Sequence, residues 1–563
     1  MHNLIQPAAE RVRGTFARAT LNFIFIILFV NVFQAVFGPE NSIVGVIFTI
    51  MMSASMVRDM TATPWKHLLI QAAVLVWMGV SACLVVTLPP LAALPINFVT
   101  IFGILYAFTY EYATHMYFPY ILSYLFLVFI SPVGPGQLPK RLTGLLAGAV
   151  CVILYQLFMG RNRVAETAQG VLTAMVDQAR ASVRFARSGE GAPASPEEVR
   201  GTLCRLSRTV YERRRRVLQV SDASFSMIDA GRGLENLVLL LAEHTLSPAL
   251  LQAVDGQLCQ IRAFLQREAD ALPAPDPAWF LPEGKAGKEL YDTLEYTCGH
   301  LRHMTDPDTR RHYRPTALSF SVRLKAALDV SPVRVLYALR VSLLLAAFTL
   351  LVQALALPHG KWLLFTLASL SLPYADDVGT KTRKRVAATI LGGLVSVAAY
   401  ALIPSMAGRT AVMMLSGYLT FYFSDYTGTY ACSTIGALGG AVVTGAFGWG
   451  PVGQMFAIRL GYICVGALIA LAANCLFFPY KRDTATRQLL KKYAATTDLL
   501  TRVSQEDSPD PQLYYDLVIQ AHLQEEKLAQ NAAQGCWPEI GAILAQGRER
   551  VRRAHRHRAP LAT

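Results

Sequence analysis

The sequence contains few charged residues for its length. Only 16% of its 563 residues are Asp, Glu, Lys or Arg, and 53% are hydrophobic, whereas a soluble protein carries about a quarter charged residues. The shortage is concentrated in 1–159 and 334–480, which hold seven of the 38 acidic residues. This distribution argues against one soluble domain and predicts two membrane-embedded blocks. The seven acids are Glu10, Glu40, Asp59, Glu111, Asp376, Asp377 and Asp425.

Signatures of enzymes and metal sites are also missing. The chain contains no GxxxxGK[S/T] phosphate loop, no HExxH and no GxSxG, so we expect neither ATP hydrolysis nor another enzymatic activity. Its nine cysteines are scattered and no CxxC occurs, which argues against a zinc site or a disulfide framework. We therefore expect no cofactor and no resident metal, and transport would run downhill or use an ion gradient.

The net charge of +14 has a membrane explanation. Basic residues gather at the cytoplasmic ends of membrane spans, where anionic lipid headgroups attract them. We therefore expect membrane lipid, and not nucleic acid, as the partner of these charges.

Each block contains about six apolar runs, several close to the roughly 20 residues that cross a bilayer. The two blocks read as a parallel repeat, because Arg18 and Arg340 open the first run of each block, and Arg141 and Arg459 lead the last. Repeated blocks of membrane helices are common in transport proteins. The runs lie near 18–37, 42–57, 67–88, 91–108, 115–131 and 141–159, then 335–356, 361–375, 384–404, 410–423, 429–447 and 457–479.

The stretches 160–333 and 481–563 read as helical and soluble. Val171, Met175 and Ala179 show the three-to-four spacing of an amphipathic helix. We predict four parts: a first membrane repeat, 1–159; a helical domain, 160–333; a second repeat, 334–480; and helices packed on that domain, 481–563. Basic residues mark the cytoplasmic side of the membrane. They lie near the N-terminus, in the loops at 58–66 and 376–385, and at 481–482. We therefore expect both termini and the two soluble parts, 160–333 and 481–563, in the cytoplasm.

Two acids stand at matching places in the repeat. Glu111 precedes Tyr112, and Asp425 precedes Tyr426. Carboxylates at membrane depth usually face a cavity, a partner or a proton path, so we predict proton coupling for both acids and substrate contact for both tyrosines. The alternative is a water-facing hairpin between short spans.

Arginines in the apolar runs are candidates for an anion path. Arg matches carboxylate geometry with two parallel donors, so Arg340, Arg141 and Arg459 are predicted to bind substrate. The alternative is that these side chains reach toward lipid headgroups. Asp59 and Asp377 follow the second run of each block and would gate the inner mouth or form structural salt bridges.

The architecture resembles the fusaric acid resistance or aromatic acid exporter family. The basic stretch entering a Gly-rich run, Lys384–Gly393 (KRVAATILGG), is similar to that family's R-x-x-G-T-x-x-G pattern, with Ala387 and Ala388 where Gly is expected. The resemblance implies efflux of aromatic carboxylic acids across a bacterial inner membrane. Some members of that family act together with a periplasmic adaptor protein and an outer-membrane channel, so the resemblance implies that this chain could have the same partners.

The sequence thus predicts an all-α, multi-pass inner-membrane exporter of aromatic or amphipathic organic anions, coupled to protons, and we expect a homo-oligomer. Two alternatives stay open. A passive anion channel would not need Glu111 or Asp425, and a membrane scaffold or sensor would depend on the helices in 160–333.

Overall fold

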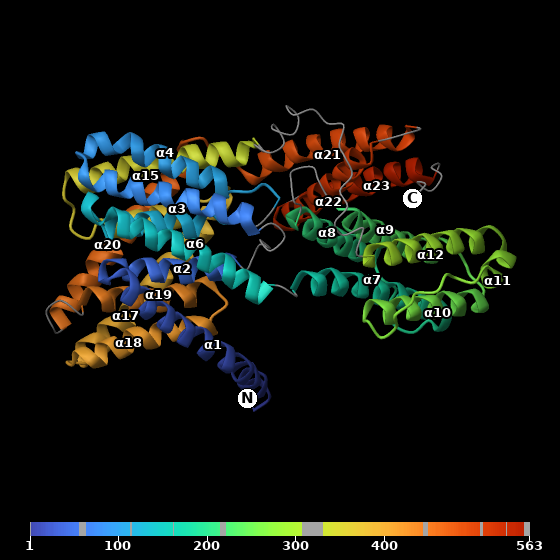
Figure 1. Cartoon of the computed structure of the whole chain (residues 1–563), viewed down its shortest axis with the longest axis horizontal. Helices are drawn as coiled ribbons and strands as arrows, with labels where there is room; N and C mark the ends of the chain where they lie inside the picture. The colour runs from blue at the N-terminus through green and yellow to red at the C-terminus, as the bar shows by residue number, and fades with distance from the viewer. Residues whose placement is uncertain are drawn as a thin grey trace. The chain divides into compact units, whose positions relative to one another are not determined.

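The computed structural model describes residues 2–55, 64–112, 115–160, 163–213, 221–306, 330–442, 449–506, 510–535 and 537–556. Within these ranges every regular element is a helix, so the predicted all-α fold is confirmed. The described residues divide into two compact units (Figure 1). The membrane unit takes in those among 1–57, 65–154 and 331–482, and the helical unit takes in those among 155–330 and 483–563.

The first block of the membrane unit closely follows the predicted apolar runs. Pro90 stands at the start of one helix, where the missing backbone N–H of proline is tolerated. The helices are α1 (His2–Phe37), α2 (Ser42–Ser55), α3 (Pro64–Thr87), α4 (Pro90–Phe108), α5 (Tyr117–Phe129) and α6 (Leu138–Gly160).

The second block also has six described helices, as the predicted repeat requires, and the repeat relation itself stays a prediction. One boundary was wrong: Asp376–Lys384, expected as a loop, forms the first turns of α17. Asp376 and Asp377 lie at the positive end of the helix dipole, which favours the helix over a loop. The helices are α15 (Pro332–Ala354), α16 (Lys361–Leu370), α17 (Asp376–Leu402), α18 (Met406–Leu419), α19 (Tyr426–Val442) and α20 (Trp449–Leu476).

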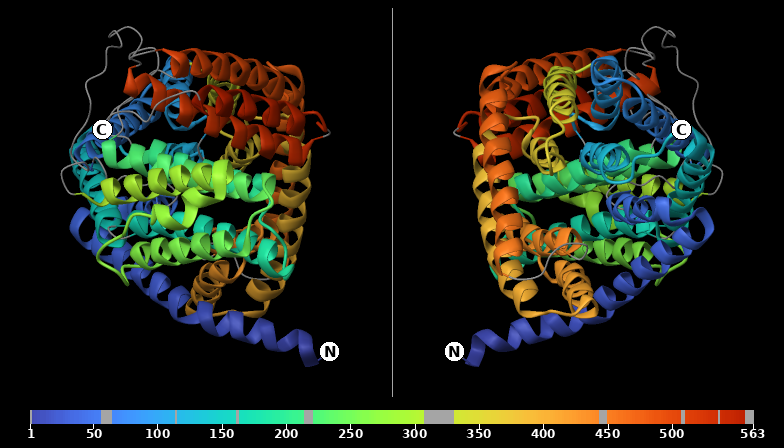
Figure 2. Two further views of the ribbon diagram at one scale, coloured as in Figure 1. Left: turned by 90° about the vertical axis from the view of Figure 1, so that its right-hand side faces the viewer. Right: turned by 90° about the vertical axis from the view of Figure 1, so that its left-hand side faces the viewer.

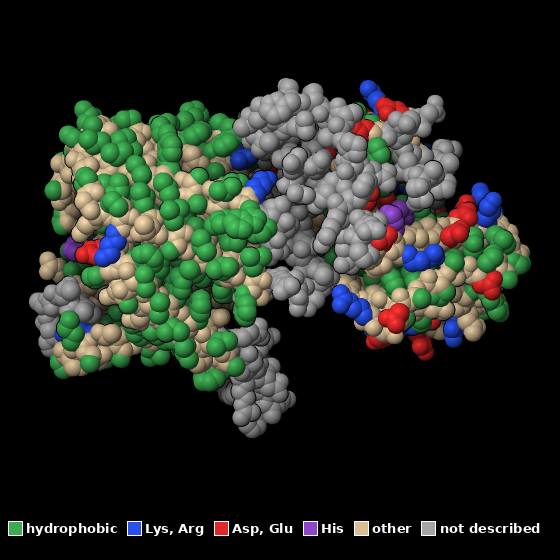
Figure 3. All heavy atoms as spheres, in the orientation of Figure 1, with side chains coloured by type: hydrophobic (Ala, Val, Ile, Leu, Met, Phe, Trp, Pro, Cys, Tyr) green, Lys and Arg blue, Asp and Glu red, His purple; other side chains and the backbone are tan. Residues whose placement is uncertain are grey.

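Seven of the described helices are long and apolar enough to cross a membrane. They are fewer than the apolar runs, because helices such as α2 and α18, with 14 residues each, and α16, with 10, are short. Figure 3 shows hydrophobic side chains over nearly the whole visible face of this unit, as a surface in contact with lipid requires. The chain is a multi-pass membrane protein. The seven spans are Ala19–Phe37, Pro64–Thr87, Pro90–Phe108, Pro135–Phe158, Pro332–Ala354, Asp376–Leu402 and Trp449–Leu476.

Helix α1 runs along the edge of the membrane unit (Figure 2). Only 6% of its apolar window is buried, and Leu21, Leu28 and Val36 are largely exposed. An apolar helix with so little protein around it is suited to a lipid environment.

Helix α17 packs closely against both α19 and α20. A side chain at Gly392 would overlap the backbone of Ala431 in α19, and one at Gly393 would overlap the ring of Phe456 in α20. Glycine at these positions lets the helices approach closely, which brings the polar side chains at the start of α17 next to α19 and α20.

The helical unit buries one apolar core between α7, α8, α9, α10 and α12, and it includes Met175, Leu203, Leu237 and Leu258. Helix α22 packs against α8, so described helices of the insert and of the tail lie in the same compact unit. Ser221, Ser247 and Asp510 cap their helices by accepting backbone N–H groups. The helices are α7 (Arg163–Ser188), α8 (Pro196–Arg213), α9 (Asp222–Glu243), α10 (Pro248–Leu265), α11 (Pro277–Phe280), α12 (Gly284–Thr305), α21 (Arg482–Gln505), α22 (Pro511–Gln534) and α23 (Ile540–Arg556).

Candidate functional site

Among the basic side chains of the membrane unit that lie against aromatic rings, three belong to the neighbouring helices α17 and α20. The guanidinium of Arg385 is 3.8 Å from the ring centroid of Tyr430. That of Arg459 is 5.2 Å from the ring centroid of Trp362. We call these groups the cationic cluster. Its members are the cations Lys381, Arg385 and Arg459 and the rings of Phe118, Trp362, Tyr426 and Tyr430.

Helix geometry explains the alignment of the cations with the rings. Lys381 and Arg385 are four residues apart on α17 and share one face of that helix, as do Tyr426 and Tyr430 on α19. Because α17 and α19 pack together, each cation meets a ring: Lys381 Nζ is 5.5 Å from the ring centroid of Tyr426. Arg459 comes from α20, the other neighbour of α17.

The positive charge of the cluster is offset only in part, by the action of Asp377 on Lys381 at a distance. Arg385 and Arg459 are only 5% and 6% exposed, and they lie close enough for their charges to repel each other. Among the described residues, no carboxylate forms an ion pair with any of the three cations. Asp377, one turn before Lys381, instead holds Arg482 through two contacts of 2.7 and 2.8 Å. A buried cation ordinarily has a partner, so this cluster has the electrostatics of an anion site.

The buried polar atoms without partners in this cluster are all hydrogen-bond donors. They are Nε and Nη1 of Arg385, Nε of Arg459 and the hydroxyl of Tyr426. Buried donors normally find acceptors; the Tyr426 hydroxyl lies close enough to Arg385 to interact with it, but among the described residues no carboxylate does. A carboxylate brings several acceptor lone pairs and negative charge together, so it complements this set of donors.

Two other predicted substrate residues lie in different surroundings. The buried Arg141 donates through Nη2 to the carbonyl of Glu40 at 2.8 Å and to Ser131 Oγ at 2.9 Å. Arg340 donates to the carbonyls of Leu372 at 2.5 Å and Phe478 at 3.2 Å. These contacts tie helix ends together. Substrate binding by Arg141 and Arg340 stays a prediction, and the contacts favour a structural role.

The two candidate coupling acids differ in environment. Asp425 is exposed, and its Oδ2 accepts the backbone N–H of Gly428 at 2.8 Å, at the start of α19. Glu111 and the adjacent Tyr112 are half-buried in the connection between α4 and α5. The carboxylate of Glu111 is close enough to Tyr374 and Tyr480 to act on them electrostatically.

Of the two predicted gating acids, only Asp377 lies among the described residues. Asp59 lies outside the described residues. Asp377 forms the salt bridge to Arg482 described above, which corresponds to the structural alternative given for it.

Of the residues predicted from the sequence, Arg459 and Tyr426 lie in the cationic cluster. Its other members were not predicted to bind substrate: Lys381, Arg385, Phe118, Trp362 and Tyr430. Lys381 and Arg385 were placed in a loop, where charge needs no explanation. Their spacing of four residues at the entry of an apolar run was the available signal, since it places both on one face of a helix. The rings could not be assigned to them, because that pairing depends on which helices pack together.

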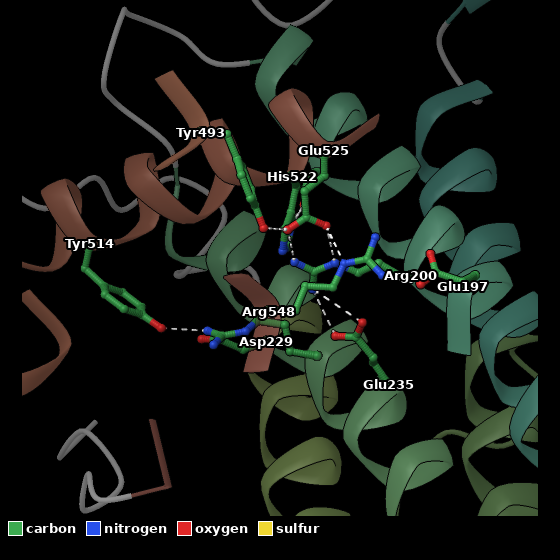
Figure 4. Close-up of polar contacts among 11 residues, drawn as sticks. Glu197, Arg200, Asp229, Glu235, Tyr493, Tyr514, His522, Glu525 and Arg548 are labelled. Atoms are coloured by element: carbon green, nitrogen blue, oxygen red, sulfur yellow. Dashed lines mark hydrogen bonds and ion pairs between the residues drawn. The ribbon is translucent and has the colours of Figure 1, made fainter. Parts of the chain in front are cut away.

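A second polar cluster lies in the helical unit (Figure 4). The buried carboxylate of Glu525 accepts from Arg200 Nε at 2.8 Å, Arg548 Nε at 2.9 Å and the Tyr493 hydroxyl at 3.0 Å. Burial raises the pKa of Glu525, but the two guanidiniums outweigh it and hold this pKa below its usual value. Because this network joins α8 to α21, α22 and α23 and its carboxylate is paired, we interpret it as structural.

His522 lies beside that network. Its Nδ1 is 2.6 Å from Ser207 Oγ, and burial, with the positive charges of nearby arginines, lowers its pKa well below the usual value. His522 is therefore a neutral core residue at physiological pH.

Comparison with known proteins places the cationic cluster in a recognised domain. Residues 345–473 match the family model described as fusaric acid resistance protein-like. The chain carries a fusaric acid resistance protein-like domain. This match confirms the resemblance noted from the sequence, and the family is one of membrane transport and efflux proteins. Apart from Phe118, every member of the cationic cluster lies in the fusaric acid resistance protein-like domain. No curated protein and no solved structure matched the chain.

Proposed function

We propose that the chain exports aromatic or amphipathic organic acids across the bacterial inner membrane, and that the cationic cluster binds them on the way. The observation that carries this proposal is the pair Arg385 and Arg459, two buried guanidiniums without a carboxylate partner, each resting on an aromatic ring. In a transport-family domain, such a pair fits an anionic cargo better than a structural role.

In the absence of cargo, aromatic rings contact the two guanidiniums that would bind its carboxylate. A cation–π contact contributes about 0.5–2 kcal/mol, whereas a hydrogen bond to a charged group contributes about 1.5–3 kcal/mol. A carboxylate that replaces a ring and accepts two such hydrogen bonds from one guanidinium therefore gains about 1–5 kcal/mol. Micromolar to millimolar binding corresponds to about 4–8 kcal/mol, which two guanidiniums can supply and which suits an exporter because the cargo must leave again.

For energy coupling, we propose Glu111 as the first candidate and Asp425 as the second. Glu111 is half-buried beside two tyrosines, so proton uptake would change a partly desolvated charge. Asp425 faces solvent and caps α19, an arrangement that a helix cap explains without a transport role.

For membrane topology and partners, we propose what the sequence predicts. Both termini and the helical unit lie in the cytoplasm, following the basic residues at the ends of the spans. A periplasmic adaptor with an outer-membrane channel, and a homo-oligomer, are the partners that we expect.

The test is efflux of 4-hydroxybenzoate from proteoliposomes with an imposed pH gradient. We expect Arg385→Gln and Arg459→Gln each to lower flux at least tenfold, because each removes one of two charged contacts. The matched control is Arg409→Gln, which removes a buried guanidinium from α18 whose Nε donates to the carbonyl of Ile403. Equal insertion of all variants is checked first.

Three outcomes separate the hypotheses. Loss of flux in the two cluster variants, with the control active, supports the proposal, whereas equal flux in all of them contradicts it. Flux that needs the cluster but follows voltage without a proton requirement identifies a passive channel, an alternative favoured by the lack of an acid in the cationic cluster. A parent protein that moves no organic acid reopens the scaffold alternative.

A further inference from the structure

We infer that the cargo preferred by the cationic cluster is an organic dianion with two carboxylates on one flat body, one for Arg385 and one for Arg459. This inference rests on the proposed function and narrows its substrate class. It comes from the number of charges in the cluster and from where the donors without acceptors lie.

Charge counting gives the first argument. Arg385 and Arg459 keep their charge at any physiological pH, and Lys381 lies one helical turn from Arg385 on the same face. The nearby acids are committed elsewhere, Asp377 to Arg482 and Asp425 to the start of α19. One monocarboxylate would leave a buried guanidinium uncompensated, which is costly.

The positions of the donors give the second argument. Nε and Nη1 of Arg385 and Nε of Arg459 lack acceptors on two different helices, α17 and α20. The donors without acceptors therefore belong to two separate guanidiniums, and each guanidinium can donate to a carboxylate of its own.

The rings give the third argument. Tyr430 covers Arg385 and is also close enough to act electrostatically on Arg459. Trp362 covers Arg459, with its ring centroid 5.2 Å from that guanidinium. A flat spacer between two carboxylates would stack in the place of these rings and keep both guanidiniums occupied.

The experiment measures binding to the purified full chain in nanodiscs by titration calorimetry. The probes are isophthalate (two carboxylates), monomethyl isophthalate (the same body with one charge), benzoate (one charge) and the neutral isophthalamide. We expect isophthalate to bind at least tenfold more tightly than its monomethyl ester, because the second carboxylate makes a second charged contact. Isophthalamide should not bind measurably.

Variants then assign the two charges. In Arg385→Gln and in Arg459→Gln, we expect isophthalate and its monomethyl ester to bind within threefold of each other. In Arg409→Gln the preference for isophthalate should persist. The comparison of the two probes on the unmodified chain decides the question even where a variant fails to fold.

Equal affinity of the unmodified chain for isophthalate and its monomethyl ester would overturn the inference and leave the proposed function standing. Binding of two benzoates per chain with the affinity of one isophthalate would overturn it too, because the cluster would then hold two separate anions. If no carboxylate binds, the proposed function fails and the inference falls with it.

Discussion

Replacing Glu525 by Gln should open the helical unit without greatly changing its shape. The side chain keeps its size but loses the charge shared by Arg200 and Arg548. Removing one partner of a buried ion pair costs about 3–5 kcal/mol, because the other charge stays buried. Since Arg200 keeps Glu235, at 3.0 Å, and Arg548 keeps Glu197, at 2.8 Å, we expect the lower end, about 3 kcal/mol.

The assay is hydrogen exchange of the full chain followed by mass spectrometry, read on peptides of α22. A loss of about 3 kcal/mol raises the exchange rate of its slowest amides about 100-fold. The matched control is Glu197→Gln, which removes another carboxylate from the same Arg548 but at a site where the side chain is 66% exposed. An exposed ion pair contributes about 0–1 kcal/mol, so this variant should change exchange less than about fivefold.

A similar small effect of both variants would refute this reasoning. It would mean that the burial of Glu525 adds nothing to the cost of losing its charge, and that the network is not what holds α22 to α8. An effect of Glu525→Gln limited to α23 would show that only the contact with Arg548 matters.

Three further predictions concern coupling, pH and helix packing. Glu111→Gln should remove the dependence of efflux on the pH gradient while Asp425→Asn retains it, as flux measured in proteoliposomes at two gradients would show. The lowered pKa of His522 means that only the unfolded chain takes up this proton, so stability is full above about pH 6.5 and falls by about 1.4 kcal/mol per pH unit below it. In His522→Asn, the stability read from hydrogen exchange of α22 should depend less on pH between about pH 6.5 and 5. An unchanged pH dependence would show that other groups cause it. Gly392→Leu should separate α17 from α19 because its side chain meets the backbone of Ala431; melting in detergent should fall by several degrees, and an unchanged midpoint would contradict the close approach.

Long periodic segments could be predicted from the sequence because their apolar pattern is local. Val171, Met175 and Ala179 indicated α7, and two of them lie in the core of the helical unit. The tail was predicted to be helical, and its described residues form α21, α22 and α23. The start of α17 was not, since a cluster of charges reads as a loop unless the helix dipole and a partner such as Arg482 are known.

The site was only partly visible in the sequence. Arg459 was identified by its place in the repeat, but the same argument selected Arg141, whose guanidinium meets the carbonyl of Glu40. The difference between the two depends on which backbone groups and rings lie opposite, and those come from helices distant in sequence. Arg385 was noted only as part of the basic stretch Lys384–Gly393 and not as a binding residue, because its partner Tyr430 is brought near only when α17 packs on α19.

The most direct test of the account is a structure of the full chain with 4-bromobenzoate, in which the bromine locates the ligand independently of the protein. The account predicts the carboxylate against Arg385 or Arg459, with the ring of Tyr430 or Trp362 displaced from that guanidinium. Bromine elsewhere in the membrane unit, with Arg385 still resting on Tyr430, would contradict the claim that the cationic cluster binds the exported anion.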